Sequence, residues 1–322
     1  MKAKIVYTLV SDEHDSYLEQ VLLSLHTVRL YHPEATIELV VDSATNPTIK
    51  DTRAEIKKYV SSIISVTIPE GYDKVQRSRF LKTNLRKLVT GDYLFIDCDT
   101  IICGKLDEID KIESNIAMVA DMNGKLLLDD EGVIDRCHAA GFNDLEGKPY
   151  FNSGVIYAKD TPVAHRLYEE WNKQWQISNR NGVSFDQPAL CQANVNVGTP
   201  IYELPGIWNC QFKFRAGYRL LDDAIILHYY SNNGGGKRSI AQDSIFKHIK
   251  EKGGIDSLVA HLVNHTKTVL TTALTINSDM AFEYFYSDML YTFFNAPKIF
   301  KIAASVARML SKPAIFIKKK KQ

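Results

Sequence analysis

The sequence predicts an α/β protein with a mostly parallel central sheet flanked by helices, and three observations predict this fold class. Short apolar runs, typical of strands that are buried on both faces, recur along the first two thirds of the chain. Amphipathic segments of helical length separate these runs, as right-handed βαβ crossovers require. The 322 residues, of which 45% are hydrophobic, can bury a sizeable core.

The expected strands and helices alternate along the chain. Strands are expected at residues 5–10, 37–41, 63–66, 93–96, 116–120, 151–157 and 225–230. Helices are expected at 16–28, 49–59, 78–88 and 162–175, and a shorter one begins at Asp186. The segment 122–149 is long, acidic and glycine-containing, and it predicts a surface excursion or lid.

The helical pattern continues alone from Ser239 onward. We therefore expect one α/β domain over residues 1–240 and a helical C-terminal extension over residues 241–322. Because ligands bind beyond the carboxyl ends of the strands in open α/β sheets, the residues that follow each strand are the candidates for chemistry.

The composition indicates a globular protein of a reducing compartment. A formal net charge of +1 and an ordinary apolar fraction exclude disorder over the whole length and disfavour a nucleic-acid partner. The five cysteines form no Cys-x-x-Cys pair, which argues against a disulfide framework or a structural zinc site. The first apolar run ends at Ser11, and no run reaches about 18 apolar residues, so we expect a cytoplasmic protein.

The strand expected at 93–96 leads directly into Asp97-Cys98-Asp99, the one strict Asp-x-Asp of the sequence. Alternation along the strand points both carboxylates to the same side. Two carboxylates this close repel each other unless a cation lies between them, and oxygen ligands suit Mg²⁺ or Mn²⁺. The alternative is that both aspartates cap the following turn.

A histidine and a glycine run near residue 230 are further candidates. His228 ends an apolar strand, where it is either a packed core residue or, beside carboxylates, a ligand for a metal such as Mn²⁺. The three glycines at 234–236 precede Lys237, so this loop could bring backbone N–H groups and a lysine to phosphate oxygens. The alternative for the glycines is a flexible turn.

Four motifs resemble glycosyltransferase family 8 in their order and spacing. They are Phe95-Ile-Asp-Cys-Asp99, Phe151-Asn-Ser-Gly-Val155, Phe185-Asp-Gln-Pro-Ala189 and Leu227-His-Tyr229, and the resemblance covers residues 4–237. It implies a GT-A fold with a Rossmann-like sheet as the catalytic domain. It also implies a retaining transfer from a nucleotide-sugar donor, usually a UDP-hexose, with Mn²⁺ (or Mg²⁺) as the cofactor.

The resemblance also implies roles for individual residues. The metal ligands would be Asp97, Asp99 and His228, with Cys98 between the two carboxylates at the nucleotide. The donor sugar would lie against Asp121, Asn152, Asp186 and Gln187. The nucleotide and its phosphates would lie against Leu9, Asp12, Tyr17, Arg79, Lys82 and Lys237, although Lys237 is displaced from the family's usual position. The alternative for Asn152, Asp186 and Gln187 is capping of helices and turns.

Retention of configuration requires either a covalent intermediate or attack from the face of the leaving group. Gln187 is a poor nucleophile, so we favour same-face attack, in which the leaving phosphate oxygen takes the proton of the acceptor hydroxyl. Asp186 is the alternative nucleophile.

Three functions are weighed on these residues. The leading hypothesis is a metal-dependent retaining hexosyltransferase that acts on a glycan or lipid-linked acceptor in cell-surface polysaccharide or lipopolysaccharide synthesis. A sugar-nucleotide nucleotidyltransferase also needs carboxylates and a metal, but no glycine-rich, arginine-containing loop follows the first strand. A catalytically silent nucleotide-binding or scaffold protein is the third possibility.

The C-terminal segment differs in charge from the rest of the chain. After Asp288 the sequence holds eight basic residues and no acidic one, and it ends in Lys318–Lys321 and Gln322. An amphipathic helix is expected over 297–310, and a basic amphipathic helix is typical of attachment to an anionic membrane surface. We therefore expect residues 296–322 to attach the protein peripherally to the cytoplasmic face of a membrane. The alternative is a helix packed on the catalytic domain with a solvated lysine run.

Overall fold

The structure is a computed structural model that describes residues 1–212, 214–229, 243–264 and 266, together with the isolated residues 298, 302, 305 and 306. The chain divides into two compact units, Met1–Lys267 and Thr268–Gln322, and all the named helices and strands lie in the first. The predicted boundary at residue 240 lies outside the described residues. In the described part of the chain, no helix is both long and apolar enough to cross a bilayer.

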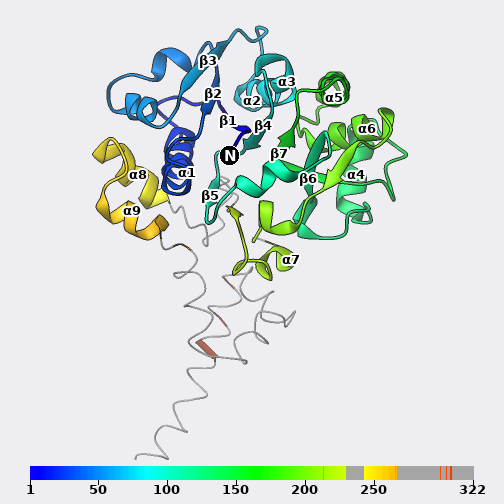
Figure 1. Ribbon diagram of the computed structural model, residues 1–322. Helices are drawn as coiled ribbons and strands as arrows, with labels where there is room; N and C mark the ends of the chain where they lie inside the picture. The colour runs from blue at the N-terminus through cyan, green and yellow to red at the C-terminus, as the bar shows by residue number, and fades with distance from the viewer. Residues whose placement is uncertain are drawn as a thin grey trace, which may run out of the picture. The chain divides into compact units, whose positions relative to one another are not determined.

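A seven-stranded sheet forms the centre of the first unit, with the strand order β3-β2-β1-β4-β7-β6-β8. The strands are β1 (Lys4–Leu9), β2 (Ile37–Asp42), β3 (Ser62–Val66), β4 (Tyr93–Ile96), β6 (Ile116–Ala120), β7 (Phe151–Ala158) and β8 (Ile201–Glu203). β7 pairs antiparallel with both of its neighbours, whereas the other strand pairs are parallel. The expectation of a mostly parallel sheet flanked by helices is therefore confirmed (Figure 1).

The described helices connect these strands and follow them. The α-helices are α1 (Tyr17–Tyr31), α2 (Lys74–Thr83), α3 (Leu85–Leu88), α4 (Glu131–Ala139), α5 (Pro162–Arg180), α6 (Gln187–Asn196), α7 (Arg215–Tyr218), α8 (Asp243–Lys252) and α9 (Ser257–Asn264). Short 3₁₀ turns are η1 (Asn46–Thr48), η2 (Asp51–Lys58), η3 (Asp107–Lys111), η4 (Asp121–Asn123) and η5 (Gly206–Asn209). α8 and α9, near the end of the first unit, contact α1 (Figure 1).

Two local expectations are wrong. The helix expected over 78–88 is broken at Asn84, which ends α2 and precedes α3. The segment 122–149 is not a surface excursion, because it contains α4 and contributes Leu128, Val133 and Phe142 to the main hydrophobic cluster. These apolar side chains gain more by burial than a solvent-exposed lid would allow.

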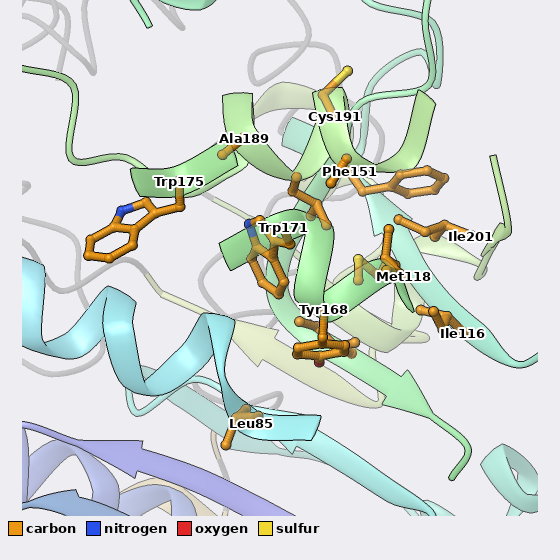
Figure 2. Close-up of a cluster of buried hydrophobic side chains, with 14 of the residues drawn as sticks. Leu85, Ile116, Met118, Phe151, Tyr168, Trp171, Trp175, Ala189, Cys191 and Ile201 are labelled. Carbon is orange, nitrogen blue, oxygen red and sulfur yellow. The ribbon is translucent and has the colours of Figure 1, made fainter. Parts of the chain in front are cut away.

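The core on one side of the sheet is built from aromatic side chains of α5 packed against β4, β6 and β7. Tyr168, Trp171 and Trp175 are buried, and the rings of Tyr168 and Trp171 meet edge to face at 5.4 Å (Figure 2). Trp171 and Trp175 donate from their ring nitrogens to the backbone oxygens of Asp186 and Ser184. The core thus fixes the chain just before α6, where the predicted sugar-binding motif begins.

A second sheet of two strands, β5 (Thr100–Ile102) and β9 (Ile226–His228), lies outside the central sheet. The strand expected at 225–230 therefore exists, but it pairs antiparallel with β5 and does not extend the central sheet.

The strand order changes direction between β1 and β4. The chain proceeds from β1 outward to β2 and β3, then returns to place β4 on the other side of β1. In open α/β sheets, ligands bind at a switch of this kind, beyond the carboxyl ends of the two central strands. Asp12 follows β1, and Asp97–Asp99 follow β4, so predicted nucleotide and metal residues lie at this switch point.

Candidate active site

The three predicted metal ligands come together beyond the end of β4. One ligand atom from each of Asp97, Asp99 and His228 lies within 4.8 Å of the other two. Nε2 of His228 is 3.2 Å from Oδ1 of Asp99. The second sheet brings these residues together, because Thr100 pairs with His228 across β5 and β9. Two carboxylates and an imidazole are a donor set suited to Mn²⁺, and the carboxylates also suit Mg²⁺.

The position of the His228 ring requires a small residue at Gly154, which follows Asn152-Ser153 in the sequence. A Cβ at this position would lie 2.5 Å from Cε1 and 2.8 Å from Nδ1 of His228. The backbone oxygen of Gly154 also accepts the N–H of Asp97 at 2.8 Å, which ties β7 to the start of the Asp-x-Asp. The glycine therefore allows the histidine ring to approach β7 beside the carboxylates.

A buried lysine and an arginine of α2 balance the charge of the carboxylates. Nζ of Lys82 is 2.8 Å from Oδ1 of Asp97 and 3.8 Å from Oδ2 of Asp186. Nε of Arg79 is 3.1 Å from Oδ1 of Asp186, within ion-pair distance, although its N–H does not point at this oxygen. Ser153 donates its hydroxyl to Oδ2 of Asp186 at 2.7 Å. Asp186 is thus held by neighbours from α2 and β7.

The charges in this cluster shift the pKa values of its members. Burial raises the pKa of Asp97, the charge of Asp99 raises it further, and Lys82 opposes both effects. Burial alone would lower the pKa of His228, but the neighbouring carboxylate of Asp99 outweighs burial, and the pKa is raised. The three side chains therefore favour proton binding, and a cation bound by them would displace protons.

The pKa of Asp186 is shifted in the opposite direction. Burial alone would raise the pKa of its carboxyl group, but Arg79 and Lys82 outweigh burial and hold the pKa below its ordinary value. Its side chain makes no capping hydrogen bond to α6. The capping alternative is therefore wrong for Asp186.

The remaining predicted sugar-binding residues lie on β7 and beside it. Nδ2 of Asn152 donates to Oδ1 of Asp121 at 2.9 Å. Nε2 of Gln187 donates to the backbone oxygen of Phe151 at 3.3 Å, so the start of α6 is tied to β7. The structure thus brings Asp121, Asn152, Asp186 and Gln187 to the same end of the central sheet as the carboxylate cluster.

The loop after β1 is held by charged contacts. Asp12 pairs with Lys74 at 2.5 Å, and this hydrogen bond lowers the pKa of Asp12 to about 2. The side chain of Leu9 is buried in the core. Burial raises the pKa of Tyr17, and the negative charges of Asp15 and Asp99 add to this effect.

Cys98 contacts the first strand of the central sheet. Its Sγ donates to the backbone oxygen of Thr8 at 3.2 Å, and burial holds its pKa well above the ordinary value. Cys98 is thus a neutral thiol that ties the Asp-x-Asp to β1. Lys237 lies outside the described residues.

Sequence reasoning missed two residues of the site. Ser153 contacts Asp186, and its position inside a motif next to Asn152 was a signal that could have identified it. Asn209 lies with its Oδ1 3.0 Å from Nδ1 of His228. It ends a short 3₁₀ turn and carries no periodic or motif signal in the sequence.

The fold and the site together define a glycosyltransferase of the GT-A fold. The model of glycosyl transferase family 8 matches residues 8–237, and the chain belongs to this family. The family, the fold class and the enzyme class expected from the sequence are therefore confirmed. A search of curated protein sequences found no significant match.

Solved structures share the fold at low sequence identity. The galactosyltransferase LgtC, in complex with donor and acceptor sugar analogs, superposes with a TM-score of 0.52 at 14% identity, over 80% of this chain and 99% of LgtC. The glycosyltransferase GlyE of Streptococcus pneumoniae TIGR4 gives 0.51 at 16% identity, over 84% of this chain and 64% of GlyE. The bifunctional glycosyltransferase WbbM gives 0.52 at 15% identity, over 81% of this chain and 51% of WbbM.

Replacing Gly154 with alanine should displace the His228 ring, because the added Cβ overlaps two ring atoms. We expect a loss of about 1–3 kcal/mol in the free energy of unfolding, as is usual for overpacked cores. Urea denaturation measures this loss. Gly104→Ala is the matched control, since its Cβ would meet nothing closer than 3.9 Å. Equal stabilities of the two variants would contradict the close contact.

Asp186→Asn should destabilise the protein by about 3–5 kcal/mol near neutral pH, because it removes the charge beside Arg79 and leaves Asp97 as the remaining partner of Lys82. The folded-state pKa of Asp186 is lowered, so its stabilising effect is present above the ordinary pKa of about 3.9 and fades below it. The difference from wild type should therefore shrink as the pH falls below about 4.

The control for this measurement is Asp129→Asn, which breaks an exposed pair with Lys125 and should leave the free energy of unfolding nearly unchanged. Urea midpoints at a series of pH values give the stability of each variant relative to wild type and its change with pH. A pH-independent difference for Asp186→Asn would show that its charge is not the stabilising feature.

Proposed function

We propose that this glycosyltransferase moves a hexose from a UDP-sugar to a glycan or lipid-linked acceptor, with retention of configuration. The proposed role is in the synthesis of cell-surface polysaccharide or lipopolysaccharide. The observation that carries the proposal is the cluster of Asp97, Asp99 and His228 beyond β4, at the switch point of the sheet. Membership of family 8 supports a nucleotide-sugar as the donor.

A divalent cation, Mn²⁺ or Mg²⁺, fits the donor atoms of this cluster. Two oxygen ligands and one imidazole nitrogen would hold it through Asp97, Asp99 and His228. When bound, such a cation neutralises negative charge on the diphosphate leaving group. Lys82 pairs with Asp97 and compensates its charge.

Arg79 and Lys82 supply positive charge beside the same carboxylates. Both side chains come from α2, and both lie beside Asp186. Their donors can form charge-assisted hydrogen bonds to a phosphate that carries growing negative charge. We infer that they stabilise the departing nucleoside diphosphate, while Asp121, Asn152, Asp186 and Gln187 orient the sugar.

The transfer breaks the bond between the anomeric carbon and the β-phosphate oxygen of the donor and forms a bond from that carbon to the acceptor oxygen. The proton of the acceptor hydroxyl passes to the departing phosphate oxygen. The chain contributes orientation of both reactants and positive charge at the leaving group, which can supply a large part of a rate enhancement.

The C-terminal residues 296–322 lie almost wholly outside the described residues, and their role is proposed from their sequence. Eight basic residues with no acidic one after Asp288 favour peripheral binding to an anionic membrane surface on the cytoplasmic side. A lipid-linked acceptor would be concentrated at such a surface.

Asp99→Ala should abolish most of the Mn²⁺-dependent release of UDP from a UDP-hexose. The expected drop is at least about 100-fold, because the metal's stabilisation of charge is worth several kcal/mol. Donor hydrolysis followed by separation of UDP from the intact donor measures the rate. Asp144→Ala, at an exposed position of the same domain, is the control that should retain activity.

Two other outcomes would change the assignment. Release of pyrophosphate in place of UDP would identify a nucleotidyltransferase. Turnover that is indifferent to Mn²⁺, Mg²⁺ and the Asp99 substitution would contradict the metal-dependent transfer.

Replacing Lys318–Lys321 with glutamine should weaken binding to vesicles that contain anionic lipid. At about 1 kcal/mol per basic residue, the partition coefficient should fall on the order of 100-fold or more. Co-sedimentation with phosphatidylserine vesicles measures it, and purely zwitterionic vesicles are the control. If deletion of residues 296–322 leaves co-sedimentation unchanged, the membrane proposal is wrong.

A further inference from the structure

We propose that Asn209 is a positioning residue for the metal cluster. Its carboxamide fixes the His228 ring with a proton on Nδ1, which leaves Nε2, beside Asp99, as the nitrogen that can bind a cation. It also joins the metal ligands to the residues that line the donor sugar. This inference rests on the proposed function, because it concerns how the same cluster is held ready for a cation.

Asn209 is the middle of a chain of hydrogen bonds that crosses the site. Nδ1 of His228 and Oδ1 of Asn209 are 3.0 Å apart. Nδ2 of Asn209 donates to Oδ1 of Asn152 at 2.8 Å. Nδ2 of Asn152 then donates to Oδ1 of Asp121 at 2.9 Å. The chain therefore runs from the predicted metal ligand to two predicted sugar-binding residues.

The donor and the acceptor of each hydrogen bond in this series can be assigned by starting from the end where the donor is a backbone N–H. The backbone N–H of Gly154 can only donate, and it donates to Oδ1 of Asn152 at 2.9 Å. The amide of Asn152 is thereby oriented, so the group of Asn209 that faces its oxygen has to be the NH₂. The oxygen of Asn209 then faces His228, and Nδ1 of the ring has to donate to it.

The result at His228 is a defined tautomer. A proton on Nδ1 leaves Nε2 as the atom with the lone pair, and Nε2 is the atom beside Asp99. Histidines that bind metals donate their second N–H to an oxygen acceptor in this way, which sets the ring orientation and raises its basicity as a ligand. Asn209 supplies that acceptor here.

The backbone around Asn209 is held as firmly as its side chain. Cys210 is bridged to Leu227 of β9, and its N–H and C=O bond to Ile226 and His228. Nδ2 of Asn123 donates to the backbone oxygen of Asn209 at 3.0 Å. Asn209 is fully buried, so water does not compete for its amide. The position of the amide is thus set by β9 and by the turn after β6.

Asn209 connects the predicted metal ligand His228 with the predicted sugar-binding residues. Any shift of His228 on metal binding acts through Asn209 on Asn152, which contacts Asp121 on the sugar side. We infer that the positions of the His228 ring and of the Asn152 amide depend on each other through Asn209, so the affinities for cation and donor are coupled.

The experiment compares Asn209→Ala and Asn209→Asp with the wild-type full-length chain, and uses Mn²⁺ alone as the probe. Asn209→Ala removes the acceptor for His228, and Mn²⁺ affinity, measured by electron paramagnetic resonance, should fall about 10- to 100-fold. Asn209→Asp keeps an oxygen for His228 but loses the donor to Asn152. It should bind Mn²⁺ at least as tightly as wild type while its apparent affinity for the UDP-hexose falls.

Asn194→Ala is the matched control, because Asn194 is another fully buried asparagine, and its Oδ1 accepts from Ile201 N–H at 3.3 Å. It should leave Mn²⁺ affinity unchanged. Melting curves establish that each variant is folded. Equal Mn²⁺ affinity of Asn209→Ala and wild type, or no recovery in Asn209→Asp, would overturn the proposal.

A second measurement does not depend on metal binding or on the variants. Nitrogen-15 NMR of histidine-labelled, metal-free wild type, at a pH where the ring is neutral, should show His228 protonated at Nδ1. A proton on Nε2 would refute the role of Asn209 even if the enzyme is active. Conversely, failure of wild type to bind Mn²⁺ with His228 protonated at Nδ1 would contradict the metal-dependent function and leave the positioning of the ring intact.

Discussion

The rest of the site depends on the ion pairs and hydrogen bond that the ammonium group of Lys82 makes. It is almost fully buried, and it contacts Asp97, Asp186 and the backbone oxygen of Ser153, so it joins α2 to the ends of β4 and β7 and to the start of α6. A buried charge without partners would cost several kcal/mol. Because Lys82 and Arg79 lie among the carboxylates, this fold can hold Asp97 and Asp186 close together before any cation or donor is bound.

The second constraint is topological. Asp99 follows β4 directly, whereas His228 is far along the sequence, and only the pairing of β5 with β9 brings the two within 3.2 Å. Residues 206–211 then run beside β9, and the side chains of Asn209 and Gln211 fasten this segment to His228 and to the turn after β6. That turn holds Met122 and Asn123 at φ values of 57° and 50°, a left-handed conformation that bulky residues rarely adopt. The surrounding hydrogen bonds therefore stabilise a backbone that would otherwise be unfavourable.

The sequence predicts the sheet and the carboxylate cluster because both depend on local patterns. An apolar run followed directly by Asp97 and Asp99 predicts a buried strand whose carboxyl end carries both aspartates to the edge of a parallel sheet. The four family motifs place His228 beside them. Three features depend instead on tertiary contacts. They are the pairing of β9 with β5, the break at Asn84 and the burial of the 122–149 segment. The role of Asn209 is of this second kind, since an asparagine in a short turn has no pattern that distinguishes it from a solvent-exposed residue.

Under the proposed retaining transfer, the contacts of Asp186 favour same-face attack over a covalent intermediate. A covalent route needs a carboxylate whose oxygen can reach the anomeric carbon. Here Oδ1 lies at Arg79, Oδ2 accepts from Ser153, and the side chain is buried. The same partners lower the pKa of the carboxyl group, which makes the oxygen a weaker nucleophile as well as a less accessible one. Gln187 has no nucleophilic oxygen of comparable strength, and its amide is tied to β7. In the reaction proposed above, Arg79 and Lys82 stabilise the departing diphosphate, and the phosphate oxygen takes the proton of an acceptor that attacks from the same face.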